Sequence, residues 1–243
     1  MTAVQPAAAR FVGQSVTRKE DRRLVTGHGR YVDDVVVPGM LHAAFLRGEV
    51  PRAGITRLDV SAAKALPGVA AVYTWEDFNG VFGEAWHAML GEQMVVPPPL
   101  AIGDVRYAGD PVALVVAETR YIAEDACDLI EVEYDPQQAV VDYVNAAADT
   151  DNIVHAGWGL ESNAMMAVPF MPMSPDLDDA FSAAEHVVEC TIEQNRYVPV
   201  PMETRGILAS FDPGRDQLEI VCSCQGVHET RNFFARYLQM PEA

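Results

Sequence analysis

The chain has 243 residues, 49% of them hydrophobic, so it is long enough to bury a real core and is not disordered by composition. Its 35 acidic residues outnumber 17 basic ones and give a formal net charge of −18, which excludes a general affinity for nucleic-acid phosphates. We find no apolar run of the roughly 20 residues that a membrane helix needs and no signal peptide, so we expect a cytoplasmic protein that binds neither nucleic acid nor membrane.

An irregular, polar lead-in over residues 1–21 is followed by a globular pattern. Two strand–helix–strand units stand on either side of a long loop, residues 79–104, which is rich in Gly and Pro and has no period. The expected strands are 40–48, 55–60, 69–78, 111–118 and 130–135, and the expected helices are 61–68 and 119–129, with Thr119 as the N-cap of the second. We therefore predict one α+β domain over residues 22–136.

Residues 137–185 are rich in turn formers and are predicted to be a linker. A second globular segment, residues 186–243, follows the linker. The expected strands are 186–194, 205–211 and 217–224, with a hairpin turn between the last two, and the expected helix is 229–240, ending before Pro241.

Acidic residues recur where basic ones are missing. Between Arg120 and Arg196 there is no Lys or Arg, whereas acids recur from Glu124 to Glu193. A solvated face that keeps the protein soluble is the simpler interpretation, and a docking face for a basic partner is the alternative.

The chain has four cysteines, and no two of them form a Cys-x-x-Cys pair. We therefore expect neither a structural zinc site nor a disulfide framework. We interpret Cys127 and Cys190 as small buried hydrophobes. In a strand, Cys222 and Cys224 would share the apolar face of Leu218 and Ile220 and pack in the core.

Gln225 would end that strand on the opposite face, where its carboxamide offers a donor and an acceptor. The next residue, Gly226, lets another backbone or a ligand approach closely. Further upstream, Glu203 and Arg205 are two positions apart and could share a strand face as a structural ion pair or hydrogen-bond anchor, or could lie near a substrate funnel.

Five segments of the chain carry a resemblance to a known family, and they follow one another in the order of that family. They are residues 18–48, 59–78, 105–136, 195–212 and 222–242. The chain resembles the N-terminal part of the molybdopterin-binding large subunit of molybdenum hydroxylases, the family of xanthine dehydrogenase, aldehyde oxidase and aerobic carbon monoxide dehydrogenase. The resemblance implies an a/b hammerhead domain followed by the start of an α+β molybdenum-cofactor-binding domain.

By this resemblance, the complete subunit oxidises or hydroxylates a small substrate (an aldehyde, an N-heterocycle or CO) with water-derived oxygen. It implies a molybdenum–pterin cofactor, in its molybdopterin cytosine dinucleotide form, and partner subunits that carry iron–sulfur clusters and FAD. It also implies that Gln225 and Gly226 are cofactor-binding and that Gln225 hydrogen-bonds an oxo ligand of the molybdenum without ligating the metal.

The family places its catalytic Glu and a Gly-Gly-x-Phe-Gly segment beyond the position of Ala243. We therefore expect an incomplete molybdenum-binding domain, no catalytic residue in this chain, and no activity unless the remainder of the large subunit or a second chain completes it. A truncated gene, a split subunit and a deliberately shortened chain are all compatible with this pattern. The alternative function is a non-catalytic assembly or interaction module.

Overall fold

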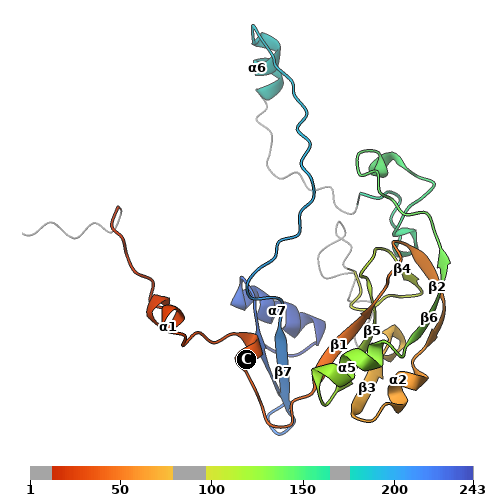
Figure 1. Ribbon diagram of the computed structural model, residues 1–243. Coiled ribbons are helices and arrows are strands. Elements are labelled where there is room, and N and C mark those ends of the chain that lie inside the picture. Colours follow the sequence, from red (N-terminus) through yellow and green to blue (C-terminus); the bar gives the residue numbers. More distant parts are fainter. Residues whose placement is uncertain (1–12, 79–96, 165–175, 243) are drawn as a thin grey trace, which may run out of the picture. The chain divides into compact units, whose positions relative to one another are not determined.

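The computed structural model describes residues 13–78, 97–164 and 176–242, which fall into two units. The larger unit comprises residues 39–195 and 226–243, and the smaller unit joins residues 1–38 to residues 196–225 (Figure 1). The smaller unit is therefore discontinuous in sequence, because the N-terminal segment and a much later segment build it.

Two three-stranded antiparallel sheets form the larger unit, with the strand orders β1-β5-β3 and β4-β2-β6. The strands are β1 (His42–Arg47), β2 (Ala53–Asp59), β3 (Val69–Tyr73), β4 (Asp104–Val105), β5 (Pro111–Ala117) and β6 (Glu131–Pro136). The central strand β5 is the most deeply buried, as its nearly continuous apolar run predicts. The predicted strand–helix–strand units are confirmed.

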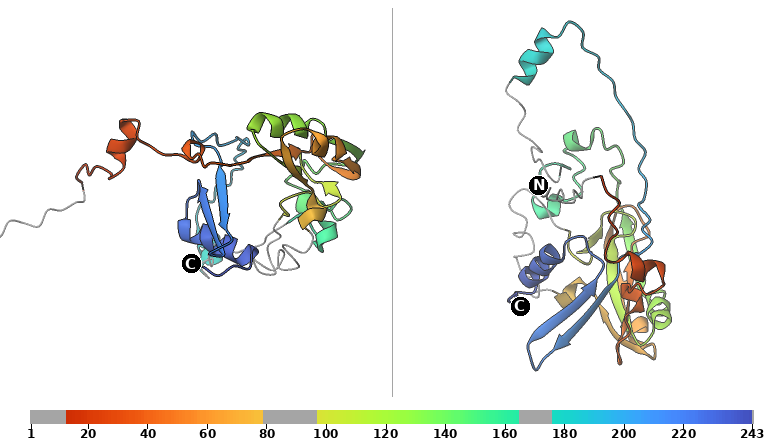
Figure 2. Two further views of the ribbon diagram at one scale, coloured as in Figure 1. Left: turned by 90° about the horizontal axis from the view of Figure 1, so that it is seen from below. Right: turned by 90° about the vertical axis from the view of Figure 1, so that its left-hand side faces the viewer.

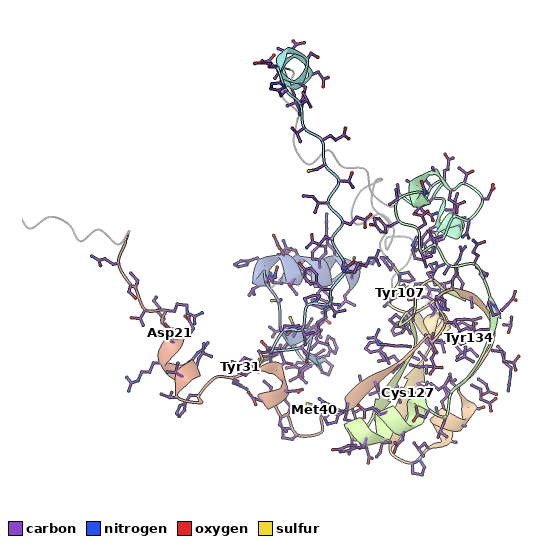
Figure 3. All side chains as sticks on the ribbon, turned by 45° about the horizontal axis from the view of Figure 1, so that its top comes forward. Asp21, Tyr31, Met40, Tyr107, Cys127 and Tyr134 are labelled. Carbon is purple, nitrogen blue, oxygen red and sulfur yellow. The ribbon has the colours of Figure 1, made fainter. Side chains whose placement is uncertain are left out.

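The helices α2 (Ser61–Ala65) and α5 (Arg120–Cys127) contribute to the core on the first sheet. Ala123, Ala126 and Cys127 of α5 are buried with Ala113 and Val115 of β5, and such small side chains let the helix backbone come close to the sheet. Cys127, labelled in Figure 3, is thus a core residue, as predicted.

The start of α5 is fixed by a side-chain cap. The Thr119 hydroxyl oxygen accepts a hydrogen bond from the Ile122 backbone N–H at 3.2 Å and satisfies one of the free amides of the first turn. The predicted N-cap is confirmed.

Two predictions around the long loop are wrong. The strand expected over residues 69–78 ends at Tyr73 and gives way to the short helix α3 (Trp75–Phe78), because the Asp77 carboxylate accepts a hydrogen bond from the Thr74 N–H at 2.7 Å and turns the chain. Residues 79–96 of the expected loop lie outside the described residues, and its last residue, Asp104, begins β4, which pairs with β2.

The first part of the predicted linker is hydrogen-bonded to the sheets. The Arg52 guanidinium donates to the Gln138 and Ile153 carbonyl oxygens, each at 3.2 Å, and to the Asn152 side chain. The Asn163 amide nitrogen bridges two more carbonyl oxygens at 3.1 and 3.2 Å. The short elements of this region are η2 (Ala146–Ala148), η3 (Ala156–Trp158) and, further on, α6 (Leu177–Ala183).

The strand expected over residues 186–194 is wrong. Residues 185–201 have no regular secondary structure, and Val188 and Ile192 are 90% and 84% exposed. Cys190 is also exposed, which corrects its expected burial. Alternating apolar residues form a strand only where a neighbouring strand supplies hydrogen bonds, and no described strand pairs with this segment.

The smaller unit contains a two-stranded antiparallel hairpin of β7 (Ile207–Asp212) and β8 (Gln217–Cys222), as predicted (Figure 2). Asp212 organises its turn, because the carboxylate accepts hydrogen bonds from the Gly214 and Arg215 amides at 2.8 and 3.3 Å. The N-terminal segment of this unit contributes the short elements α1 (Asp21–Val25) and η1 (Val32–Asp34).

The helix α7 (Val227–Tyr237) belongs to the larger unit and confirms the expected helix, two residues earlier at its start. It ends where Gln239 adopts a left-handed φ of 52° and the Met240 N–H donates to the Ala235 carbonyl at 2.9 Å. The Arg231 guanidinium then binds the Glu242 carboxylate at 2.8 Å and holds the residues that follow the helix.

Candidate functional site

An open hollow of about 1060 Å³ lies within the smaller unit. Its walls come from residues 30–37, residues 201–205 and the hairpin, and its rim reaches Gln225. Two arginines, Arg30 and Arg205, and two glutamates, Glu203 and Glu219, line it. The charges of these side chains balance in a chain that is otherwise strongly acidic.

One wall of the hollow is held in place by Glu203. Its Oε1 accepts a hydrogen bond from the Val32 backbone N–H at 3.3 Å. Val32 also lies close to Gly206, where an added Cβ would be 3.0 Å from a Val32 methyl carbon. Glu203 is therefore a hydrogen-bond anchor, one of the two roles expected of it, and both Glu203 and Arg205 line the hollow.

Ser223 fixes the end of the hairpin. Its hydroxyl donates to the Thr204 carbonyl oxygen and accepts from the Gly206 N–H, both at 3.3 Å, and its own N–H donates to the Gly206 carbonyl oxygen at 3.3 Å. These three bonds join the segment after β8 to the segment before β7.

The strand β8 ends at Cys222, earlier than predicted, because the Gly206 N–H donates to the Ser223 side-chain hydroxyl, so the regular backbone ladder stops there. Gln225 therefore lies three positions beyond the strand and is exposed at the rim of the hollow. Cys222 is half-buried and Cys224 is exposed. The expected core packing is thus wrong for Cys224 and only partly correct for Cys222.

Gly226 is the N-cap residue of α7. A Cβ at this position would lie 2.8 Å from a Glu229 carboxylate oxygen, so the glycine leaves room for that carboxylate in the first turn of the helix. An acidic side chain there interacts favourably with the helix dipole. Gly226 thus has a visible structural role, and its expected contact with a cofactor stays a prediction.

A partly buried polar cluster in the larger unit was not predicted. Arg106, with its side chain 8% exposed, binds Asp104 at 2.6 Å and has its guanidinium carbon 4.0 Å from the centre of the Trp158 ring. The His155 ring stacks on the Trp158 ring, with 4.5 Å between the two ring centres. Asp104 and Arg106 are close in sequence, as are His155 and Trp158, but the contact between the two pairs joins distant segments and has no local signal in the sequence.

Burial shifts the pKa of three side chains in this cluster. It raises the pKa of the Asp104 and Asp110 carboxyl groups, although Arg106 opposes the shift in both. Burial also lowers the pKa of His155, and the charges of Arg106 and Arg52 lower it further. The Nδ1 atom of His155 is buried without a hydrogen-bond partner, so no hydrogen bond at this atom would stabilise the protonated, positively charged ring.

No helix in residues 13–78, 97–164 and 176–242 has both the length and the hydrophobicity needed to cross a membrane. Within the same ranges, no three His, Cys, Asp or Glu side chains are grouped so that they could hold a metal ion.

Two family models match the chain. The model of the aldehyde oxidase and xanthine dehydrogenase a/b hammerhead domain matches residues 26–138, and that of the molybdopterin cofactor-binding domain matches residues 161–243. Together they cover parts of both units and all of the resembling segments except residues 18–25.

Individual proteins agree with these models. The chain is 37% identical to the nicotine 6-hydroxylase large subunit of Paenarthrobacter nicotinovorans, over 98% of this chain and 29% of that subunit. It is 31% identical to the carbon monoxide dehydrogenase large chain of Hydrogenophaga pseudoflava, over 99% and 31%. The crystal structure of quinoline 2-oxidoreductase from Pseudomonas putida 86 matches with a TM-score of 0.81 and 35% identity, over 95% of this chain and 29% of that one. The chain thus spans less than a third of the length of these relatives.

Proposed function

The chain belongs to the molybdenum hydroxylase family and matches the N-terminal part of its large subunits, and on this premise we propose that its smaller unit supplies one wall of the molybdenum-cofactor site. In this proposal, the Gln225 amide nitrogen donates a hydrogen bond to an oxo ligand of the cofactor. The observation that carries it is the position of Gln225, exposed at the rim of the hollow and directly before the α7 N-cap.

The side chains at the rim fit a cofactor that carries its own metal and metal ligands. No described group of acidic, His or Cys residues could hold a metal ion by itself, so the cofactor's pterin would have to carry the metal. A carboxamide can donate to an oxygen acceptor without adding a charge, and such residues orient a metal's ligands and tune its electronics. When bound, the cofactor accepts two electrons from the substrate.

We propose that the complete enzyme hydroxylates an aromatic N-heterocycle with water-derived oxygen. Aldehydes and CO are the other substrate classes that the family offers. The N-heterocycle is favoured because two of the most similar relatives are named for nicotine and quinoline, at 37% and 35% identity. The substrate would be selected mainly by parts of the large subunit that this chain does not contain, since it spans 29% of these relatives.

Partners follow from the same proposal. Relatives are large subunits or named subunits of a complex, such as the 6-hydroxypseudooxynicotine dehydrogenase complex subunit gamma at 34% identity. We propose iron–sulfur and FAD-binding partner subunits, a cofactor in the cytosine dinucleotide form, the remainder of the large subunit or a second polypeptide that completes it, and assembly in the cytoplasm.

The test compares Gln225→Ala with wild type after the chain is co-produced with such a polypeptide and the partner subunits. We expect Gln225→Ala to retain stoichiometric molybdenum and to lose turnover by roughly 10- to 100-fold, the usual effect of removing a residue that supports a metal's ligands. Gln217→Ala is the matched control, because Gln217 is exposed on the same hairpin and does not line the hollow. Full turnover of Gln225→Ala would refute the role of Gln225, and an assembled complex without molybdenum would favour a non-catalytic module.

A further inference from the structure

Two cysteines lie at the hollow beside Gln225. Cys222 is the last residue of β8, Cys224 follows two positions later, and both line the hollow. Both cysteines are free, and Cys224 is exposed. The pair is independent of the role proposed for Gln225, because it is defined by the thiols and the hollow alone.

The backbone between the two cysteines is held by Ser223. The Ser223 hydroxyl is engaged with the Thr204 carbonyl oxygen and the Gly206 N–H, so this side chain bonds to the segment that precedes β7. Side chains on either side of a residue in extended backbone point away from it. With Ser223 anchored in this way, the side chains of Cys222 and Cys224 both lie on the side opposite to the Ser223 hydroxyl, next to each other.

The two sulfur atoms also interact. Burial raises the pKa of the Cys222 thiol, and the neighbouring Cys224, with which it hydrogen-bonds, raises it further.

We propose that Cys222 and Cys224 form a two-thiol chelating site for a soft, thiophilic metal or metalloid centre. The neighbouring side chains restrict the class of ligand. A structural zinc ion takes four protein ligands, and the described residues bring no third His, Cys, Asp or Glu close enough to the pair. Soft centres such as Cu(I) prefer sulfur ligands, and we infer that two thiolates suffice for this site.

Binding would be a substitution without redox change. With a trivalent arsenical, two S–H bonds break and two As–S bonds form, and the arsenical oxygen leaves as water with the two thiol protons. With Cu(I), each thiol loses its proton to solvent as a Cu–S bond forms. Because the thiols must be deprotonated, Cu(I) affinity should rise with pH.

Titration of the reduced 243-residue chain with phenylarsine oxide tests whether the two thiols act together. Mass spectrometry should find one arsenical per chain, and one equivalent should protect two thiols from a thiol-reactive dye. Changing either Cys222→Ser or Cys224→Ser should weaken binding by roughly 100-fold or more, because the second sulfur acts at a high effective concentration. Cys190→Ser, which removes an exposed cysteine elsewhere, should leave binding unchanged.

A parallel titration with Cu(I) held by a competing chelator distinguishes a metal from a metalloid. Tight Cu(I) binding that is lost in both single variants would establish the metal, and arsenical binding alone would restrict the site to metalloids. The proposal is overturned if either single variant retains wild-type affinity for both probes, or if neither probe binds. Circular dichroism and a second variant, Cys222→Ala, ensure that a loss of binding does not come from unfolding.

Discussion

The backbone N–H of Val32 donates a hydrogen bond to Oε1 of Glu203, 171 positions later in the chain, at 3.3 Å. Gly206 lies close to the same valine and admits it only because it has no side chain. This pair of contacts fixes the N-terminal segment as a wall of the hollow, so changes at positions 203 and 206 should alter that wall without touching Gln225.

Gly206→Ala should destabilise the smaller unit by about 1 kcal/mol, because the new methyl group would lie 3.0 Å from a Val32 methyl carbon. Hydrogen exchange of the β7 and β8 amides would measure the loss. Adding Val32→Ala should recover part of it by removing the crowded methyl. Gly157→Ala is the control, since nothing lies within 4 Å of its added Cβ, and an equal loss there would contradict the steric explanation.

Gly48→Ala should destabilise the larger unit by about 1–3 kcal/mol, as overpacking in a core usually does. The added carbon would lie 2.9 Å from a methyl carbon of Val105, which is fully buried and cannot move aside freely. Urea unfolding would give the difference in free energy. Gly54→Ala in the adjacent strand β2 should cost less, because its nearest contact is 3.6 Å away, and a larger cost there would refute the argument.

Thr119→Ala should lower the free energy of unfolding by about 1 kcal/mol, the usual cost of removing an N-cap side chain. The Thr119 oxygen satisfies the Ile122 amide, and alanine would leave that amide to water. Thr119→Ser keeps the hydroxyl and should retain most of the stability. If both variants were equally destabilised, the methyl group of Thr119 and not its hydroxyl would be the stabilising part.

Acidification should weaken the attachment of residues 146–163 to the sheets. The pKa of His155 in the folded chain lies below its ordinary value of 6.5, so the unfolded chain binds more protons and stability rises with pH. The contribution of His155 is therefore fully present above about pH 6.5 and is lost as the pH falls below it. Arg52 and Arg106 oppose its protonation, and the nearby carboxylates Asp104 and Asp110 titrate with the opposite sign.

Comparison with His155→Phe isolates this effect, because phenylalanine keeps a ring on Trp158 and cannot be protonated. Urea unfolding between pH 5 and pH 7.5 should show a shallower pH dependence for His155→Phe than for wild type. His186→Asn, at an exposed histidine, should follow the wild-type curve. An unchanged slope in His155→Phe would show that His155 does not control the transition.

Local signals predicted most of the larger unit. The apolar run of β5 marked a central strand, and the threonine before α5 marked its start, because both depend on neighbours in sequence. The Asp212 turn and the hairpin that it closes were predicted for the same reason.

Features that depend on distant partners were missed. The alternation around Val188 predicted a strand that has no described neighbour, and the early end of β8 follows from the bonds of Ser223 to residues 204–206. The attachment of Ile153 depends on Arg52, 101 positions earlier. The position of Gln225 at a hollow could not be predicted from its neighbours in sequence, because the opposite wall comes from the N-terminal segment.

The contact between Val32 and Glu203 has a consequence for biosynthesis. A ribosome adds about 5–20 residues per second, so the partner of Val32 is made roughly 10–30 s after Val32 itself. During that interval the larger unit can fold, because nearly all of its strands lie between the two residues. Until Glu203 is synthesised, the N-terminal segment lacks this partner in the nascent chain, and a chaperone or a protease could bind it.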